Sequence, residues 1–170
     1  MIARFRCTCL AFAVGTLLSL SAHAHDPSKH AKAALVQDIA PAAADAVKVV
    51  DAFHAALKAA KLADAEKLLD PSVLILESGG AERNREQYMQ GHAGADAQFL
   101  SQAQQRLTYR RAQVEGSLAW VGSESTLQRT KDGKRLNLAE TETMLLKKSV
   151  QGWKIVHIHW SSRPIPADNP

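Results

Sequence analysis

The feature that most constrains this chain is a change of hydrophobic period near residue 105. From there on, apolar and polar residues alternate over four segments, 107–115, 118–129, 135–148 and 152–164. Alternation with a period of two is typical of strands, whose successive side chains point to opposite faces of a sheet. Short turns that contain glycine separate the four segments. The segments are therefore predicted to form an antiparallel meander.

The part of the chain before the meander has the period of helices. Apolar residues recur every three or four positions over residues 47–60, and residues 63–69 form a shorter segment of the same kind that Pro71 ends. A buried strand is predicted at residues 73–76, and Asn84 is a suitable N-cap for a further helix. Helices followed by a meander predict an α+β fold in which the helices cover one face of a curved antiparallel sheet.

The first 24 residues have the pattern of a secretory signal peptide. A basic start with Arg4 and Arg6 precedes an apolar run that ends at Leu20, and Ala22-His23-Ala24 follows as a cleavage site of small residues. The apolar run is short for a membrane span, although an uncleaved anchor is the alternative. We expect a periplasmic or secreted protein without membrane association after cleavage.

The remaining chain is expected to hold one folded domain with two flanking segments. Residues 25–42 are rich in Ala and Lys and are predicted to be a flexible leader with a short helical turn around residues 31–39. The domain is expected at residues 43–164, followed by a tail at residues 165–170.

Cysteine content and charge exclude several functions for the mature chain. Cys7 and Cys9 both lie in the predicted signal, so disulfides and thiolate sites are excluded after cleavage. Cleavage also removes Arg4 and Arg6, which leaves 19 basic residues against 17 acidic ones, a net charge of +2. This balance gives no reason to expect a nucleic-acid partner.

Two carboxylates in the third predicted strand are candidates for acid–base chemistry. Glu140 and Glu142 are two positions apart and share a strand face with apolar residues. Burial disfavours a carboxylate and raises its pKa toward the working range of a proton-transfer group. The alternative is an ordinary cross-strand ion pair with Arg110 or Arg111.

A histidine pair stands in the last predicted strand. Alternation places His157 and His159 on the face that carries Trp153 and Ile155. Two imidazoles at this spacing could hold zinc with a third ligand. The candidates for that ligand are His92, Glu77 and Glu140. The alternatives are hydrogen bonds to strand hydroxyls or a position at a dimer contact.

Other side chains are candidates for lining a small-molecule pocket. Tyr88, Trp120 and Trp160 are large and amphipathic. His92 and Asp96 are four apart, so the carboxylate could orient the imidazole. His54, on the apolar stripe of its helix, is expected to be packed at the edge of the core. The sequence contains no Ser-His-Asp order, Walker loop or dinucleotide fingerprint.

From about residue 46 to residue 163 the chain resembles the nuclear transport factor 2-like superfamily, also called the SnoaL-like domain. The matching features are the helix at residues 47–60, the segment Leu69-Asp70-Pro71, the turn Glu77-Ser78-Gly79-Gly80, the helix with Tyr88 and His92, and above all the closing Gly152-Trp153-Lys154-Ile155-Val156-His157-Ile158-His159. The resemblance implies a cone-shaped α+β barrel with a pocket, and it implies dimers. The superfamily contains isomerases, dehydratases and binding domains, so the resemblance does not fix a function.

Two departures from relatives in this superfamily bear on function. The kinase association domain carries a pocket arginine on the strand that matches Glu142-Thr143-Met144, and this chain has none there. Steroid isomerases use a tyrosine and two aspartates. Tyr88 or Tyr109 could supply the phenol, but no aspartate falls on a core-facing strand position.

We therefore expect an exported SnoaL-like protein that binds a small, partly apolar molecule without a cofactor and forms a homodimer. The alternatives are an isomerase or lyase that moves a proton, and a metal-binding protein. The candidate catalytic residues are Glu77, Glu140, Glu142 and His157. The candidate ligand-binding residues are Tyr88, His92, Trp120, His159 and Trp160. The alternative metal ligands are His157, His159 and His92.

Overall fold

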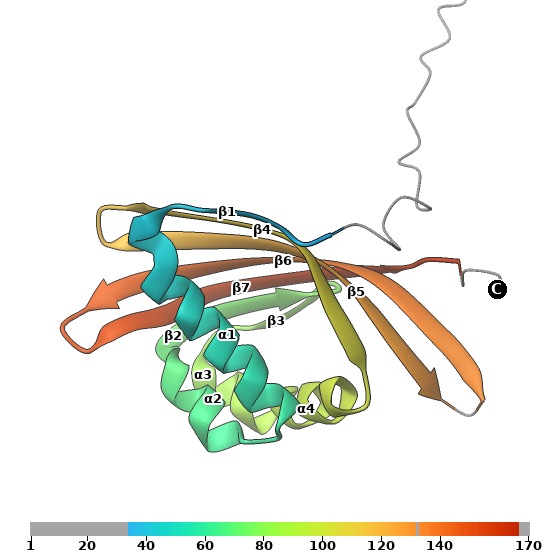
Figure 1. Ribbon diagram of the computed structural model, residues 1–170. Helices are drawn as coiled ribbons and strands as arrows, with labels where there is room; N and C mark the ends of the chain where they lie inside the picture. The colour runs from blue at the N-terminus through green and yellow to red at the C-terminus, as the bar shows by residue number, and fades with distance from the viewer. Residues whose placement is uncertain (1–33, 132, 167–170) are drawn as a thin grey trace, which may run out of the picture.

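The computed structural model describes residues 34–131 and 133–166, which form one curved sheet with helices on one side (Figure 1). The strands are β1 (Val36–Ile39), β2 (Leu69–Glu77), β3 (Gly80–Glu82), β4 (Gln104–Glu115), β5 (Leu118–Lys131), β6 (Lys134–Ser149) and β7 (Gly152–Pro164). The helices are the short 3₁₀ helix η2 (Pro41–Ala43) and the α-helices α1 (Ala44–Lys58), α2 (Leu62–Leu68), α3 (Arg85–Gln90) and α4 (Ala93–Ser101).

The predicted antiparallel meander is confirmed. In the sheet order β1-β4-β5-β6-β7-β2-β3, strands β4 to β7 pair with their neighbours in sequence. Gly116, in the β4–β5 turn, has φ 59°, a left-handed conformation that glycine adopts without steric cost. At the two sides of the meander, β1 pairs parallel to β4, and β2 pairs parallel to β7.

Helix α1 lies along the concave face of the sheet and supplies much of the core (Figure 1). Its apolar stripe, with Val50, Phe53 and Leu57 fully buried, packs against Met144, Ile158 and other residues of the sheet. The predicted cap of the third α-helix is also confirmed, because Asn84 Oδ1 accepts a hydrogen bond from the Gln87 amide at 2.8 Å. The expected α+β fold is therefore correct.

The helical turn predicted around residues 31–39 of the leader is wrong. Residues 36–39 form strand β1, paired with β4 from Tyr109 to Ala112, instead of a helical turn. Four residues are too few for hydrophobic period to distinguish a strand from a helix. The predicted signal, residues 25–33 of the leader and residues 167–170 of the tail lie outside the described residues. Within the described ranges, no helix is long and apolar enough to span a membrane.

The predicted faces of the last strand are also wrong, because β7 contains a bulge at Val156. Leu146 pairs with Ile155 while the next residue of β6, Leu145, pairs with His157. One extra residue in β7 reverses the alternation beyond it. Ile155 and Ile158 are therefore both fully buried, and His157 and His159 leave the face of Trp153 and Ile155.

Candidate functional site

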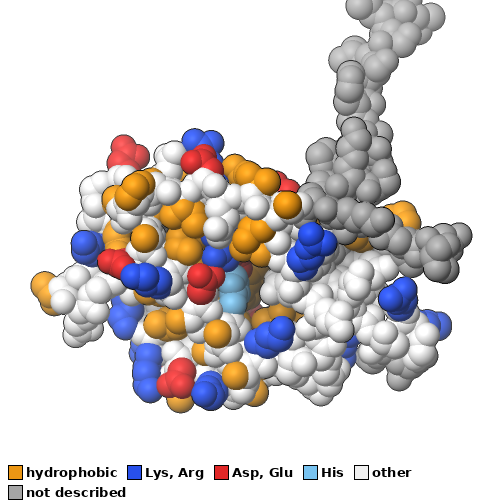
Figure 2. All heavy atoms as spheres, viewed as in Figure 1, with side chains coloured by type: hydrophobic (Ala, Val, Ile, Leu, Met, Phe, Trp, Pro, Cys, Tyr) orange, Lys and Arg blue, Asp and Glu red, His pale blue; other side chains and the backbone are white. Residues whose placement is uncertain are grey.

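A cavity of about 280 Å³ lies between helices α1 and α4 and the concave face of the sheet. One part of its wall is apolar, formed by Leu57, Phe99, Leu100 and Leu107. The other lining residues are Asp51, His54, Asp96, Gln105, Arg110, Ser123, Ser125, Glu140, Thr141, Glu142 and Trp160. Figure 2 shows a hollow on this side of the molecule, with a histidine side chain beside it.

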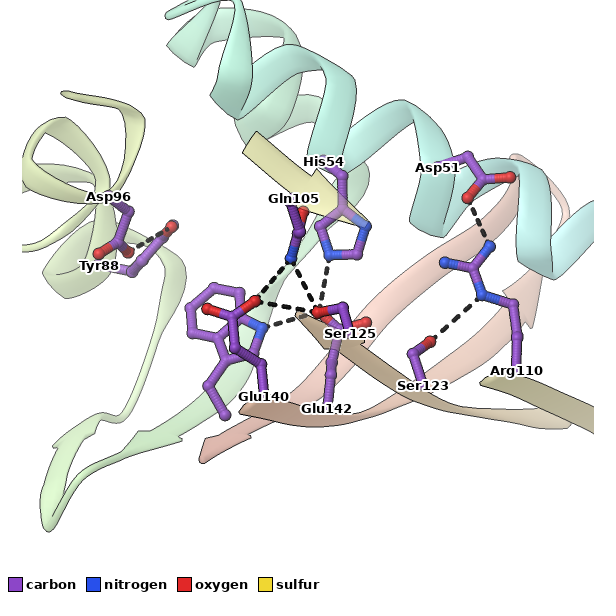
Figure 3. Close-up of polar contacts among 11 residues, drawn as sticks. Asp51, His54, Tyr88, Asp96, Gln105, Arg110, Ser123, Ser125, Glu140 and Glu142 are labelled. Atoms are coloured by element: carbon purple, nitrogen blue, oxygen red, sulfur yellow. Dashed lines mark hydrogen bonds and ion pairs between the residues drawn. The ribbon is translucent and has the colours of Figure 1, made fainter. Parts of the chain in front are cut away.

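At the centre of the polar wall, His54 of α1 meets Glu142 of β6 (Figure 3). The distance from His54 Nε2 to Glu142 Oε2 is 2.6 Å, and Trp160 Nε1 donates to the same oxygen at 2.7 Å. The His54 side chain is 24% exposed and that of Glu142 is 9% exposed. The other oxygen, Glu142 Oε1, is buried and receives no hydrogen bond from the described residues.

Burial opposes the charged form of both partners, but their mutual attraction is larger. The Glu142 carboxylate raises the pKa of His54 above its ordinary value of 6.5 despite that burial. In turn, His54, with help from Trp160, lowers the pKa of Glu142 below 4.5. Between those two values the two groups form an imidazolium–carboxylate pair.

Arg110 of β4, whose own side chain is buried, forms a second set of polar contacts in the cavity wall. Its Nη1 donates to Asp51 Oδ1 at 2.6 Å and its Nε donates to Ser123 Oγ at 3.2 Å. The expected alternative, in which Arg110 or Arg111 pairs with Glu140 or Glu142, is therefore wrong. Arg111 points to the other side of β4 and pairs with Asp38 at 3.1 Å.

Glu140 is held by uncharged donors. Gln105 Nε2 donates to Glu140 Oε2 at 2.9 Å and Ser125 Oγ donates to the same oxygen at 3.0 Å (Figure 3). The described residues supply no ion pair to this carboxylate. Glu140 thus brings a negative charge to the cavity wall that no neighbouring cation neutralises.

Asp96 of α4, which the sequence analysis considered only as a partner for His92, is an acid in the cavity wall. Tyr88, fully buried, donates its hydroxyl to Asp96 Oδ2 at 3.0 Å. Burial raises the pKa of Asp96, and the bond from Tyr88 only partly opposes that rise. Burial and the adjacent Asp96 carboxylate also raise the pKa of the Tyr88 phenol, so the hydroxyl remains a donor.

Two other candidates lie outside the cavity lining. Glu77 ends β2, and burial raises its pKa, with the Asp96 charge adding to the rise. His92 Nδ1 is bonded to Glu82 Oε1, which raises the pKa of His92. The expected His92–Asp96 pair is therefore wrong, since each residue has another partner.

The remaining candidates lie on the outer face of the sheet. His157 Nδ1 donates to the Leu74 carbonyl at 2.8 Å, and His159 is exposed, paired across the strands with Thr143. Trp120 lies on the same face, with its ring 5.9 Å from the Arg111 guanidinium carbon. In residues 34–131 and 133–166, no three His, Cys, Asp or Glu side chains gather in a way that could hold a metal.

Of the predicted site residues, the structure thus brings Glu140, Glu142 and Trp160 together in the cavity, with Tyr88 bonded to its wall through Asp96. Sequence reasoning missed His54 and Asp51, which are three apart on one face of α1. It also missed Ser123 and Ser125, which pair across β5 and β6 with Glu142 and Glu140. Polar residues at these inward positions of two adjacent strands were the available signal.

Similar solved structures share this fold. A protein of Shewanella frigidimarina described as a "putative ketosteroid isomerase" is 32% identical, with 75% of this chain and all of that chain covered and a TM-score of 0.68. The "putative calcium/calmodulin dependent protein kinase II association domain" of Xanthomonas campestris is 24% identical over 79% of this chain and 96% of that chain, with a TM-score of 0.60.

A "putative dehydratase from the NTF2-like family" of Streptomyces avermitilis is 17% identical over 72% of this chain and 95% of that chain, with a TM-score of 0.56. These last two likenesses, below 25% identity, concern the fold alone. A search of curated proteins gave no match. The model of the SnoaL-like domain matches residues 47–166, and the chain therefore belongs to the SnoaL-like family of the nuclear transport factor 2-like superfamily.

Proposed function

We propose that the protein binds a small, partly apolar molecule in the cavity. The observation that carries this proposal is Glu142 Oε1, a buried acceptor in the cavity wall to which no described group donates. An unsatisfied buried polar group costs about 1–3 kcal/mol, and a ligand with a donor at this point would recover that cost. The apolar wall opposite would cover the rest of the ligand.

Filling the cavity tests this proposal. Leu107→Trp adds a ring at the apolar wall, and Leu118→Trp adds the same ring at an exposed position. Native mass spectrometry of the purified protein is expected to detect a bound small molecule in the wild type and in Leu118→Trp, and to lose it in Leu107→Trp. Equal retention in the two variants would place binding outside the cavity and contradict the proposal.

A second candidate, proton transfer next to a carbonyl group, has its own support. The cavity holds an acid with a raised pKa, Asp96, and a protonated donor, His54. In this reaction the Asp96 carboxylate takes a proton from the α-carbon, the imidazolium donates a hydrogen bond to the carbonyl oxygen, and the Asp96 carboxyl then returns the proton to the γ-carbon. The similarity to the Shewanella protein adds support by analogy.

Isomerisation of a small cyclic β,γ-unsaturated ketone to its conjugated isomer tests this second candidate by absorbance. Asp96→Asn and His54→Gln are each expected to lower the rate by about 100-fold, the usual contribution of a general acid or base. Glu86→Gln, an exposed change on α3, is the matched control. A wild-type rate equal to that of buffer would contradict proton transfer and leave ligand binding as the function.

Export and dimerisation also remain proposals. N-terminal sequencing of protein recovered from the cell exterior or periplasm should begin at His25 if residues 1–24 are a signal.

For the dimer, we propose a contact through the outer face of the sheet, where Leu74 and Leu145 are exposed beside Trp120. Leu145→Asp should then shift the sedimentation mass from dimer to monomer, and a wild-type monomer would contradict this proposal.

A further inference from the structure

The charges in the cavity wall do not balance. Four carboxyl groups line the cavity, those of Asp51, Asp96, Glu140 and Glu142, against the two cationic groups of Arg110 and His54. Both cations already have partners at 2.6 Å, Arg110 with Asp51 and His54 with Glu142. Whether Asp96 is protonated or ionised, Glu140 leaves the wall with at least one excess negative charge.

The excess charge lies next to the unsatisfied acceptor. Glu140 and Glu142 project from one face of β6, with Cα atoms about 7 Å apart at ordinary strand spacing. Both hydrogen bonds to Glu140 reach Oε2, and Glu142 Oε1 receives none from the described residues. The two oxygens without a donor among the described residues, Glu140 Oε1 and Glu142 Oε1, point away from each other (Figure 3), so a cation in the cavity can bond to one of them while the charge of the other carboxylate attracts it.

The chemistry of such a donor follows from the charge. An ammonium group has three hydrogen-bond donors and no acceptor, so it can bond to a free carboxylate oxygen here and presents no lone pair to the other carboxylate. Bonds between a cation and a carboxylate are about twice as strong as neutral ones. A carboxylate or phosphate ligand would instead meet Glu140 and would have to compete with Asp51 for Arg110 and with Glu142 for His54.

We infer that the ligand is a primary or secondary amine with a compact apolar body, whose ammonium group is held by the negative charge of the cavity wall at Glu140 and Glu142. This inference rests on the proposed binding function and deepens it. The apolar body lies against Leu57, Phe99, Leu100 and Leu107. At about 280 Å³, the cavity is near the lower end of small-molecule sites, which favours a single ring or a short chain.

Matched compounds that differ only in the polar group test the inference. 2-Phenylethylamine, 2-phenylethanol and phenylacetate share one ring, and the same trio can be built on cyclohexyl and hexyl bodies. Titration calorimetry should give the amine at least about tenfold tighter binding than the alcohol, the size expected for a charge-assisted bond. The carboxylate should bind more weakly than the alcohol. The Trp160 indole NH signal, whose proton bonds to Glu142, should shift on amine binding.

Glutamine variants separate the charge from the shape. Glu140→Gln should weaken amine binding about tenfold while leaving the alcohol unchanged. Glu142→Gln should do the same, and Glu140→Gln keeps the test valid if that second variant unfolds. Glu115→Gln, an exposed change at the end of β4, removes the same charge outside the cavity and should leave all affinities unchanged.

Three results would overturn the inference: a carboxylate or alcohol that binds as tightly as its matched amine, amine binding that Glu140→Gln leaves unchanged, or no binding by any amine of the three trios. If an alcohol or carboxylate binds as tightly as its matched amine and Leu107→Trp abolishes that binding, only the preference for an amine is overturned and the proposed function stands. If none of the compounds binds, the inference of an amine ligand fails, and the proposed binding function is tested separately by native mass spectrometry of the wild type, Leu107→Trp and Leu118→Trp.

Discussion

Two histidine–glutamate pairs in this protein use the same chemical groups in different surroundings. In the cavity, the His54 side chain is 24% exposed and its partner Glu142 is 9% exposed. At the outer pair, Glu82 is similarly shielded, at 10%, but His92 is 65% exposed. The partners of both pairs are in hydrogen-bonding contact, and the glutamate raises the pKa of both histidines.

The two pairs differ in the cost of burying their charged groups, which the attraction between histidine and glutamate must offset. Burial works against charge on His54 and Glu142, so their pair persists only because the two groups neutralise each other. Water can solvate His92 when its partner is removed. Contact geometry alone therefore does not identify a functional pair, whereas burial beside a cavity does.

The largest effect is expected from removing the charge of Glu142. Glu142→Gln leaves the His54 imidazolium without its counter-charge in a buried place and should lower the free energy of unfolding by about 3 kcal/mol. Glu82→Gln is the matched control and should cost less, since His92 remains in water. Urea unfolding at pH 6 measures both. Equal losses would remove the distinction between the two pairs.

The second effect concerns the neighbouring arginines of β4. The Arg110 side chain is only 5% exposed, so Asp51→Asn should destabilise the protein by about 2 kcal/mol, the size of a hydrogen bond between charged groups. The equivalent change on the outer face, Asp38→Asn at the Arg111 pair, should cost about 0.5 kcal/mol or less. A larger loss for Asp38→Asn in thermal melts would contradict this ranking.

The pH dependence of stability should follow the buried pair. The raised pKa of His54 contributes stability that is complete below 6.5 and is lost as pH rises through its folded value. The lowered pKa of Glu142 contributes stability that is present above 4.5 and is lost as pH falls through its folded value. The pair should therefore be strongest between these two values.

Comparing melting temperatures at pH 6 and pH 9 checks this window. His54→Gln should flatten the dependence above pH 6.5, while His92→Gln should largely keep it. The opposite result would make the exposed pair the origin of the pH dependence.

The smallest effect is expected on the outer face of β7. The double change of His157 and His159 to Ala should alter the free energy of unfolding by about 0.5 kcal/mol or less per site. Elemental analysis of wild-type protein should find no stoichiometric zinc or copper. Zinc in the wild type that the double variant loses would restore the metal-binding alternative.

The helices and the meander were predictable because their hydrophobic periods extend over many residues. The inward positions of Glu140 and Glu142 were predictable for the same reason. The faces of β7 were predicted wrongly because strict alternation was assumed through Ile155 and Val156, two adjacent apolar residues that interrupt the alternation where the pairing with β6 shows the extra residue. A bulge shifts the alternation by one position, so the residues beyond it lie on the face opposite to the one that unbroken alternation gives.

His54 illustrates why the site itself was only partly predictable. On its own helix it resembles a residue at the edge of the core, and its partner Glu142 is 88 positions away in sequence. The two residues meet only in the folded chain, where α1 lies across the concave face of the sheet (Figure 1). The Tyr88–Asp96 bond likewise depends on how α3 and α4 pack, which hydrophobic period does not specify.

The most direct test of the buried pair is an NMR titration of the His54 imidazole, with His92 and the solvent-exposed His159 in the same spectra. The His54 pKa should lie above 6.5 in the wild type and fall in Glu142→Gln, whereas Glu82→Gln should lower only the His92 value. A His54 pKa at or below 6.5 in the wild type would mean that burial outweighs the attraction of Glu142. It would contradict the charged pair at the centre of the cavity.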